Sequence, residues 1–206
     1  PALARETEAD EAHGERFVSL EMYHTALAHV FAVTMPVAVG GLFVAYGVME
    51  LGFGAAYYPS VPVLQVLIWV IPVAVLRTVP WSALIARDRQ DLLMKATLYA
   101  VLLNAALNLF LVPSMGMLGA ALATLLAEPL ACGLMLYHAQ KCGLPIIPLR
   151  RLLKAGVAVT GMALALHWLG TDAVLPQVAV GVATYAAILA MLGALRIRKG
   201  VPVLDV

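Results

Sequence analysis

Residues 92–138 read LLMKATLYAVLLNAALNLFLVPSMGMLGAALATLLAEPLACGLMLYH, and Lys95 and Glu128 are the only lysine, arginine, aspartate or glutamate in the stretch. The turn-forming sequence Pro113-Ser114-Met115-Gly116 divides it into apolar runs at 92–112 and 117–138. A helix needs about 20 apolar residues to cross the hydrocarbon core of a bilayer. The stretch therefore predicts two membrane-spanning helices joined by a tight turn.

The same pattern recurs along the chain. Four further apolar runs of spanning length lie near 24–50, 61–85, 150–169 and 174–195. Apolar residues make up 63% of the sequence and charged residues 12%, against roughly 45–50% and about 25% in soluble domains. A soluble chain of 206 residues could not hide so much apolar surface from water. We therefore predict an all-α integral membrane protein with about six transmembrane helices.

The basic residues indicate how the chain is oriented in the membrane. Connections rich in charge alternate with connections that contain no lysine or arginine, and 12 of the 13 basic residues fall on one side. These twelve are Arg5, Arg16, Arg87, Arg89, Lys95, Lys141, Arg150, Arg151, Lys154, Arg196, Arg198 and Lys199. By the positive-inside rule, both termini are predicted to be cytoplasmic, with residues 1–22 a polar lead-in and 200–206 a short tail. We expect the lead-in to be solvated, with a short amphipathic helix around residues 16–23.

Several functional classes have no support in the sequence. The net charge of +1 gives no sign of a nucleic-acid partner, and Cys132 and Cys142 are expected to be free thiols. The five histidines have no ligand-type residues at metal-binding spacing, and no phosphate-binding loop or nucleophile elbow occurs. We therefore expect no metal, no cofactor and no enzymatic activity. The polar, acidic start of the chain is also unlike a secretory signal peptide.

The second to fourth predicted spans carry a recognisable combination of motifs. These are Phe53-Gly54-Ala55-Ala56-Tyr57, Val63-Leu64-Gln65-Val66-Leu67-Ile68, Leu84-Ile85-Ala86-Arg87-Asp88-Arg89-Gln90, the Asn104-x-x-x-Asn108 pair followed by Pro113, and Gly116-x-x-Gly119-Ala120-Ala121-x-Ala123-Thr124 followed by Glu128. In combination they resemble the C-terminal portion of the polysaccharide (O-antigen-type) flippases, which belong to the multidrug/oligosaccharidyl-lipid/polysaccharide exporter superfamily.

The resemblance implies part of a transporter fold that is built of two helical bundles around a central cavity. Residues 23–139 would be a four-span portion of the C-terminal bundle, and residues 140–199 would add two further helices. Members of the superfamily are usually at least twice as long as this chain. A missing N-terminal half, a second copy of the chain or glycan-assembly proteins would therefore complete the transporter.

Two charged residues lie deep within the predicted spans. Arg77 stands ten residues before Arg87, about 15 Å along a helix, and a charge at such depth costs at least about 2.5–3.5 kcal/mol unless it faces protein or water. Arg77 could contact an anionic substrate such as the diphosphate of a lipid-linked sugar, because guanidinium binds phosphate in a bidentate manner. It could instead form a structural pair with Glu128, which lies equally deep. Glu128 could alternatively couple transport to a proton or cation.

Asn104 and Asn108 are predicted to share one helix face, since they are four residues apart. Hydrogen bonding across helices is the ordinary role of such amides in membranes, and recognition of sugar hydroxyls is the more specific hypothesis. Pro36, Pro62, Pro72 and Pro80 are expected to interrupt helical hydrogen bonding wherever they stand inside a span.

Three functions remain open at this stage. The resemblance favours a transporter in the bacterial plasma (inner) membrane that translocates lipid-linked oligosaccharides by alternating access, with Arg77, Asn104 and Asn108 as substrate-binding residues. The first alternative is a proton- or sodium-coupled exporter of cationic drugs that depends on Glu128. The second is a non-transporting partner in a glycan-assembly complex.

Overall fold

A computed structural model describes residues 2–144, 149–171, 173–193, 195–198 and 201–204. Within these ranges, six helical segments are long and apolar enough to cross a membrane, as predicted. The elements are α1 (Ala2–Phe53), the 3₁₀ helix η1 (Ala55–Ser60), α2 (Val61–Ile68), α3 (Val70–Ile85), α4 (Gln90–Met115), α5 (Met117–Lys141), α6 (Leu149–Leu169), α7 (Val174–Met191), β1 (Leu195–Arg198) and β2 (Val201–Leu204).

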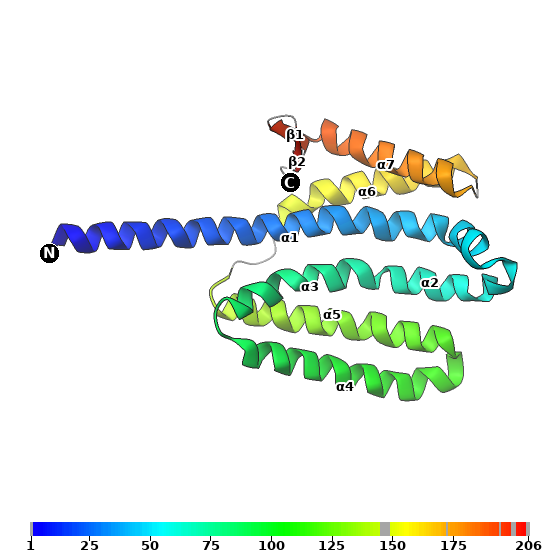
Figure 1. The fold of residues 1–206 in the computed structure, drawn as a ribbon, viewed down its shortest axis with the longest axis horizontal. Coiled ribbons are helices and arrows are strands. Elements are labelled where there is room, and N and C mark those ends of the chain that lie inside the picture. The colour runs from blue at the N-terminus through cyan, green and yellow to red at the C-terminus, as the bar shows by residue number, and fades with distance from the viewer. Residues whose placement is uncertain (1, 145–148, 172, 194, 199–200, 205–206) are drawn as a thin grey trace.

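The six segments run alternately in opposite directions along the long axis of the molecule, which is horizontal in Figure 1. The connections α1–α2, α4–α5 and α6–α7 lie at the end opposite the N-terminus, and the charged α3–α4 connection lies at the other end. This arrangement agrees with the alternation of charged and uncharged connections in the sequence. The protein is therefore a multi-pass, all-helical membrane protein, apart from a short hairpin at its C-terminal end.

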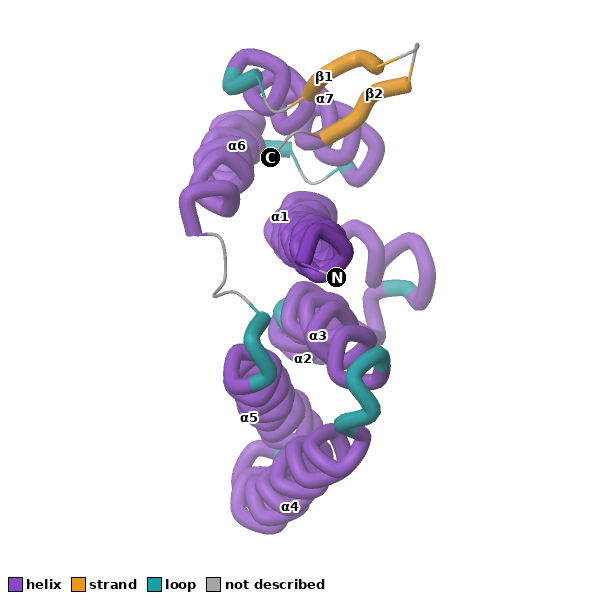
Figure 2. Tube along the Cα trace, turned by 90° about the vertical axis from the view of Figure 1, so that its left-hand side faces the viewer, coloured by secondary structure: helices purple, strands orange, loops and turns teal. Residues whose placement is uncertain are grey.

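Helix α1 is the centre of the bundle. It lies between α6 and α7 on one side and α2 and α3 on the other (Figure 2). It is a single helix of 52 residues that includes almost all of the polar lead-in, so the expectation of only a short helix around residues 16–23 is wrong. Since α1 packs on both groups of helices, it joins the predicted four-span unit to the two C-terminal helices.

The second span is broken into three helical pieces, and its prolines account for the breaks. Gly54 has φ +83°, so η1 starts after a residue in a conformation that favours glycine. Pro62 stands in the first turn of α2, where its missing N–H costs nothing. Pro72 cannot donate a hydrogen bond to the Ile68 carbonyl, and the helix ends there in a turn in which the Trp69 N–H bonds to Val66 O at 3.2 Å.

Small residues fill the interior and large apolar residues cover the outside. Among the residues whose burial is described, thirteen of the buried core residues are alanines, including Ala123, Ala127 and Ala131 along one face of α5. Phe110, Trp168 and Leu175 are 77%, 85% and 83% exposed. A soluble protein has the reverse arrangement, whereas helices in lipid associate through small residues and present large side chains to the acyl chains. The burial pattern therefore independently supports the membrane assignment.

The C-terminal end differs from the prediction. The last span ends at Met191 rather than near residue 195, and β1 pairs antiparallel with β2, with Leu195 opposite Leu204. The hairpin includes residues 201–204 of the predicted tail, and residues 200, 205 and 206 lie outside the described part of the chain.

A side chain of α7 compensates for a proline in α1. Pro36 has no N–H to bond the Ala32 carbonyl, and the Tyr185 hydroxyl donates to that oxygen at 2.5 Å. We expect Tyr185→Phe to lower the free energy of unfolding by about 0.6–1.7 kcal/mol, the range for hydrogen bonds inside membrane proteins. The melting temperature in detergent would measure this change. Tyr99→Phe is the control, because Tyr99 is 57% exposed on α4, and an equal effect of both variants would contradict the prediction.

Candidate functional site

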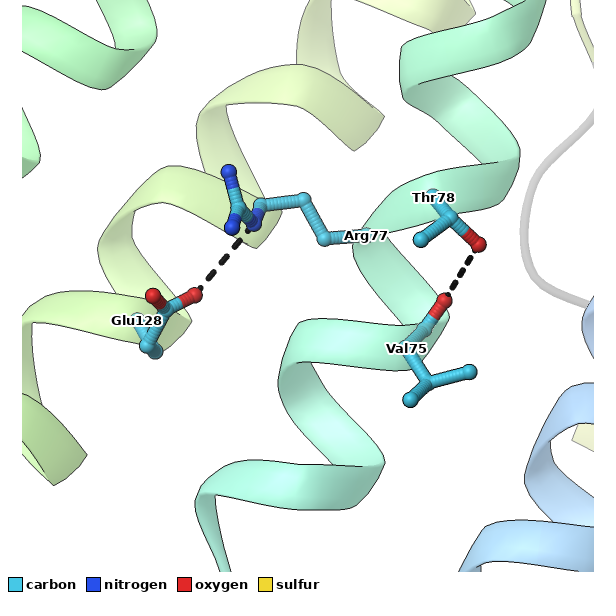
Figure 3. A network of polar contacts seen from close by, with 4 residues as sticks. All are labelled: Val75, Arg77, Thr78 and Glu128. Atoms are coloured by element: carbon cyan, nitrogen blue, oxygen red, sulfur yellow. Dashed lines mark hydrogen bonds and ion pairs between the residues drawn. The ribbon is translucent and has the colours of Figure 1, made fainter.

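The two deep charges of the sequence meet between α3 and α5. Arg77 Nε lies 3.3 Å from Glu128 Oε2 (Figure 3). Ten residues separate Arg77 from Arg87, and twelve separate Glu128 from Gly116, so both charges lie well inside their spans. The first outcome concerns the structural interpretation: Arg77 forms the expected pair with Glu128. Binding of substrate by Arg77 stays a prediction.

The contact is an ion pair rather than a well-formed hydrogen bond. Both facing atoms are shielded from solvent, yet neither has a hydrogen bond of good geometry to any described residue. The side chains as a whole are still 26% and 25% exposed. The guanidinium has five N–H donors, and Nε accounts for only one of them. The pair therefore neutralises charge within the membrane without using most of the donors of Arg77.

Arg77 also lines a small cavity. The cavity has a volume of about 230 Å³, and its lining consists of Ala74, Arg77, Thr78 and Trp81. The Thr78 hydroxyl is already satisfied, because it donates to the Val75 carbonyl at 2.6 Å (Figure 3). Arg77 is the only charged residue among the four described residues that line the cavity.

A larger apolar groove lies next to this cavity. It has a volume of about 590 Å³ between α3 and α4, and it shares Trp81 with the cavity of Arg77. Its other lining residues are Ile85, Gln90, Leu93, Met94, Thr97, Leu98 and Val101. The sequence did not point to this groove or to Trp81, because the lining depends on how α3 and α4 are rotated relative to each other.

Asn104 and Asn108 lie on α4, apart from the ion pair in the described contacts. Asn108 Nδ2 donates to Asn104 O at 2.8 Å and to Asn104 Oδ1 at 2.9 Å. The hydrogen bonds that the structure gives these amides stay within α4, and their bonding across helices stays a prediction. Asn104 stands twelve residues before Gly116 and Glu128 twelve after it, so the two lie at similar depth in the α4–α5 hairpin.

The charged α3–α4 connection is hydrogen-bonded to the C-terminal end of α5. Arg87 Nη1 donates to the carbonyl oxygen of Cys142, just after the last turn of α5. A cation is favourable there because the carbonyls at a helix C-terminus carry partial negative charge. This bond holds the α3–α4 connection against the end of α5, and so helps to fix α3 and Arg77 relative to Glu128.

No other reactive constellation stands out in the part of the chain that the structure describes. Cys132 and Cys142 are free thiols, as expected, and no three His, Cys, Asp or Glu residues in the described ranges are placed to hold a metal ion. The site consists of one cation, one carboxylate, an adjoining cavity and an apolar groove. Such a site can bind and release an anionic amphiphile.

Comparison with known proteins gives one informative result. No protein-family model matches the sequence, and no curated protein matches it. Among solved structures, the chain is similar to the lipid II flippase MurJ in an inward closed conformation, with a TM-score of 0.78 and 18% sequence identity. The match covers 87% of this chain and 40% of the flippase chain. The chain therefore has the fold of part of a membrane flippase and spans less than half of that protein's length.

Proposed function

We propose that this chain is part of a transporter that moves lipid-linked oligosaccharides across the bacterial inner membrane by alternating access. The observation that carries the proposal is the Arg77–Glu128 pair, which places a quarter-exposed guanidinium beside a cavity at mid-span. A cation in that position can receive a diphosphate, the feature common to lipid-linked sugars. The flippase-like fold supports the same class of function.

The mechanism would depend on exchange of partners at Arg77. Without substrate, Glu128 balances the charge of the guanidinium. A diphosphate offers more acceptor atoms and a greater charge than one carboxylate oxygen, and guanidinium binds it in a bidentate manner. Binding would therefore separate the pair, and this change could favour one orientation of the cavity over the other. No covalent step is needed, only a difference in affinity between the two states.

The proposal also gives roles to Asn104 and Asn108 and to the partners that would complete the cavity. Asn104 lies near the depth of Glu128, so the amides of Asn104 and Asn108 are candidates for bonds to sugar hydroxyls. The remaining wall of the cavity would come from an N-terminal half, from a second copy or from a glycan-assembly protein. The positive-inside rule places both termini of this chain in the cytoplasm.

Deleting the gene tests the proposal directly. We expect loss of surface polysaccharide and accumulation of its lipid-linked precursor in the cytoplasmic leaflet. The assay measures surface glycan together with the leaflet in which the precursor resides. A wild-type copy should restore both, whereas an Arg77→Ala copy should not.

Two other outcomes would favour the alternatives. Unchanged glycan with greater sensitivity to cationic drugs would indicate a coupled exporter that depends on Glu128. Full restoration by the Arg77→Ala copy would indicate a partner in glycan assembly, because such a role does not need the cation in the cavity.

A further inference from the structure

The α1–α2 connection gathers aromatic rings around one carboxylate. Tyr46, Glu50 and Phe53 follow one another at helical spacing and so share a face of α1, and η1 adds Tyr57 and Tyr58. The chain turns sharply between them at Gly54, whose N–H bonds to the carbonyls of Met49 and Glu50. We call these five side chains the aromatic cluster. It lies at the end of the bundle opposite the N-terminus (Figure 1).

The rings form two pairs beside the carboxylate. The ring centroids of Tyr46 and Tyr58 are 6.1 Å apart at 60°, and those of Phe53 and Tyr57 are 5.5 Å apart at 47°. Glu50 lies near the Tyr58 hydroxyl. All four rings are well exposed, from 37% for Tyr58 to 64% for Phe53. The cluster is therefore a preformed surface with ring faces and a carboxylate open to a ligand.

An ordinary membrane-interface belt does not account for the carboxylate. Belts use tyrosine and tryptophan because one end of each ring is apolar and the other polar. Glu50 is the only lysine, arginine, aspartate or glutamate between Glu21 and Arg77, so no cation adjoins it in sequence. The other connections at this end, residues 113–116 and 170–173, contain no tyrosine. At this end of the bundle, tyrosine is thus concentrated around Glu50, whereas the sequence 170–173 carries Asp172 without a tyrosine.

We infer that the aromatic cluster binds the sugar portion of the transported molecule. The weakly positive C–H face of a pyranose ring is attracted to the negative face of an aromatic ring. A carboxylate accepts hydrogen bonds from two neighbouring hydroxyls. The negative charge of Glu50 selects neutral or N-acetylated sugars and repels acidic ones. This inference rests on the proposed function, and it places a subsite for the glycan at the end of the bundle opposite the basic connections.

Saturation-transfer NMR on the purified chain in detergent tests the inference, with chitotriose and cellotriose as probes. Both sugars should receive magnetisation from the protein. Tyr57→Ala/Tyr58→Ala should weaken binding on the order of tenfold, the equivalent of about 1.4 kcal/mol, and Glu50→Gln should weaken it less. Tyr99→Ala is the matched control, because Tyr99 is 57% exposed but lies on α4, and it should bind as wild type does. Should the alanine variant not fold, Tyr58→Phe keeps the ring, removes the hydroxyl near Glu50 and should still weaken binding.

The outcomes separate this inference from the proposed function. Absence of binding to either sugar, or equal binding by wild type and cluster variants, would overturn the inference and leave only an interface belt. Binding that depends on the cluster, together with unchanged surface glycan after gene deletion, would support the sugar site and overturn the flippase proposal.

Discussion

Gly119→Ala is expected to prevent α4 and α5 from packing as they do in the native protein. A methyl group at Gly119 would lie 2.3 Å from the carbonyl oxygen of Leu111 and 2.5 Å from the carbonyl carbon of the same residue. Both atoms belong to the backbone of α4, so no side-chain rotation can make room. Overpacking costs about 1–3 kcal/mol where side chains can adjust, and a rigid backbone places this variant at or above the top of that range. The melting temperature and the yield of monodisperse protein in detergent would measure the loss.

Gly133→Ala is the matched control on the same helix. A methyl group at Gly133 meets no atom of another helix within 4 Å. Since alanine is a better helix former than glycine by up to about 1 kcal/mol, this variant should be as stable as wild type or slightly more stable. Equal melting temperatures for the two variants would show that α4 and α5 can separate without loss of the fold.

The close approach at Gly119 illustrates what the sequence could predict. Gly116-x-x-Gly119 with neighbouring alanines is a small-residue pattern typical of close helix packing, and Gly119 lies against the Leu111 backbone. Apolar length and the alternation of charged connections predicted the six spans. These patterns lie within each helix and its connections, so they can be recognised without knowing which helices pack against it.

Prediction from sequence was wrong about the length of α1, and it missed the pairing of the two C-terminal strands. The acidic residues from Glu6 to Glu21 indicated a solvated lead-in, but charged residues are also compatible with an exposed helix, and α1 continues through them. The hairpin after α7 was missed because its strands have four residues each, too few for a reliable alternating pattern.

The candidate site was predicted only in part, for a related reason. Two opposite charges deep in apolar spans have few stable options, so the pairing of Arg77 with Glu128 could be anticipated. The groove between α3 and α4 depends on the rotation of one helix against the other, and the gathering of rings around Glu50 depends on the path of η1. No single span carries that information.

Neutralising both members of the ion pair is expected to separate its structural role from its role in transport. Arg77→Ala alone would leave the Glu128 carboxylate without its partner, and Glu128→Gln would do the same to the guanidinium. Removal of one partner from a buried pair costs about 3–5 kcal/mol, and the quarter exposure of these side chains should reduce that cost. Both single variants should therefore melt earlier than wild type. The double variant Arg77→Gln/Glu128→Gln has no unpaired charge and should regain most of that loss.

Transport by the double variant should stay low even though its stability recovers. Charge-assisted hydrogen bonds are worth about 1.5–3 kcal/mol, so loss of the guanidinium should slow translocation of a lipid-linked oligosaccharide roughly 10- to 100-fold in reconstituted vesicles. Arg77→Lys keeps the charge but not the bidentate geometry, and it should fall between wild type and the double variant. If the double variant folds and transports as wild type does, Arg77 serves only to balance Glu128. Stability that returns while transport stays low would instead mean that the membrane tolerates Arg77 because the substrate needs it.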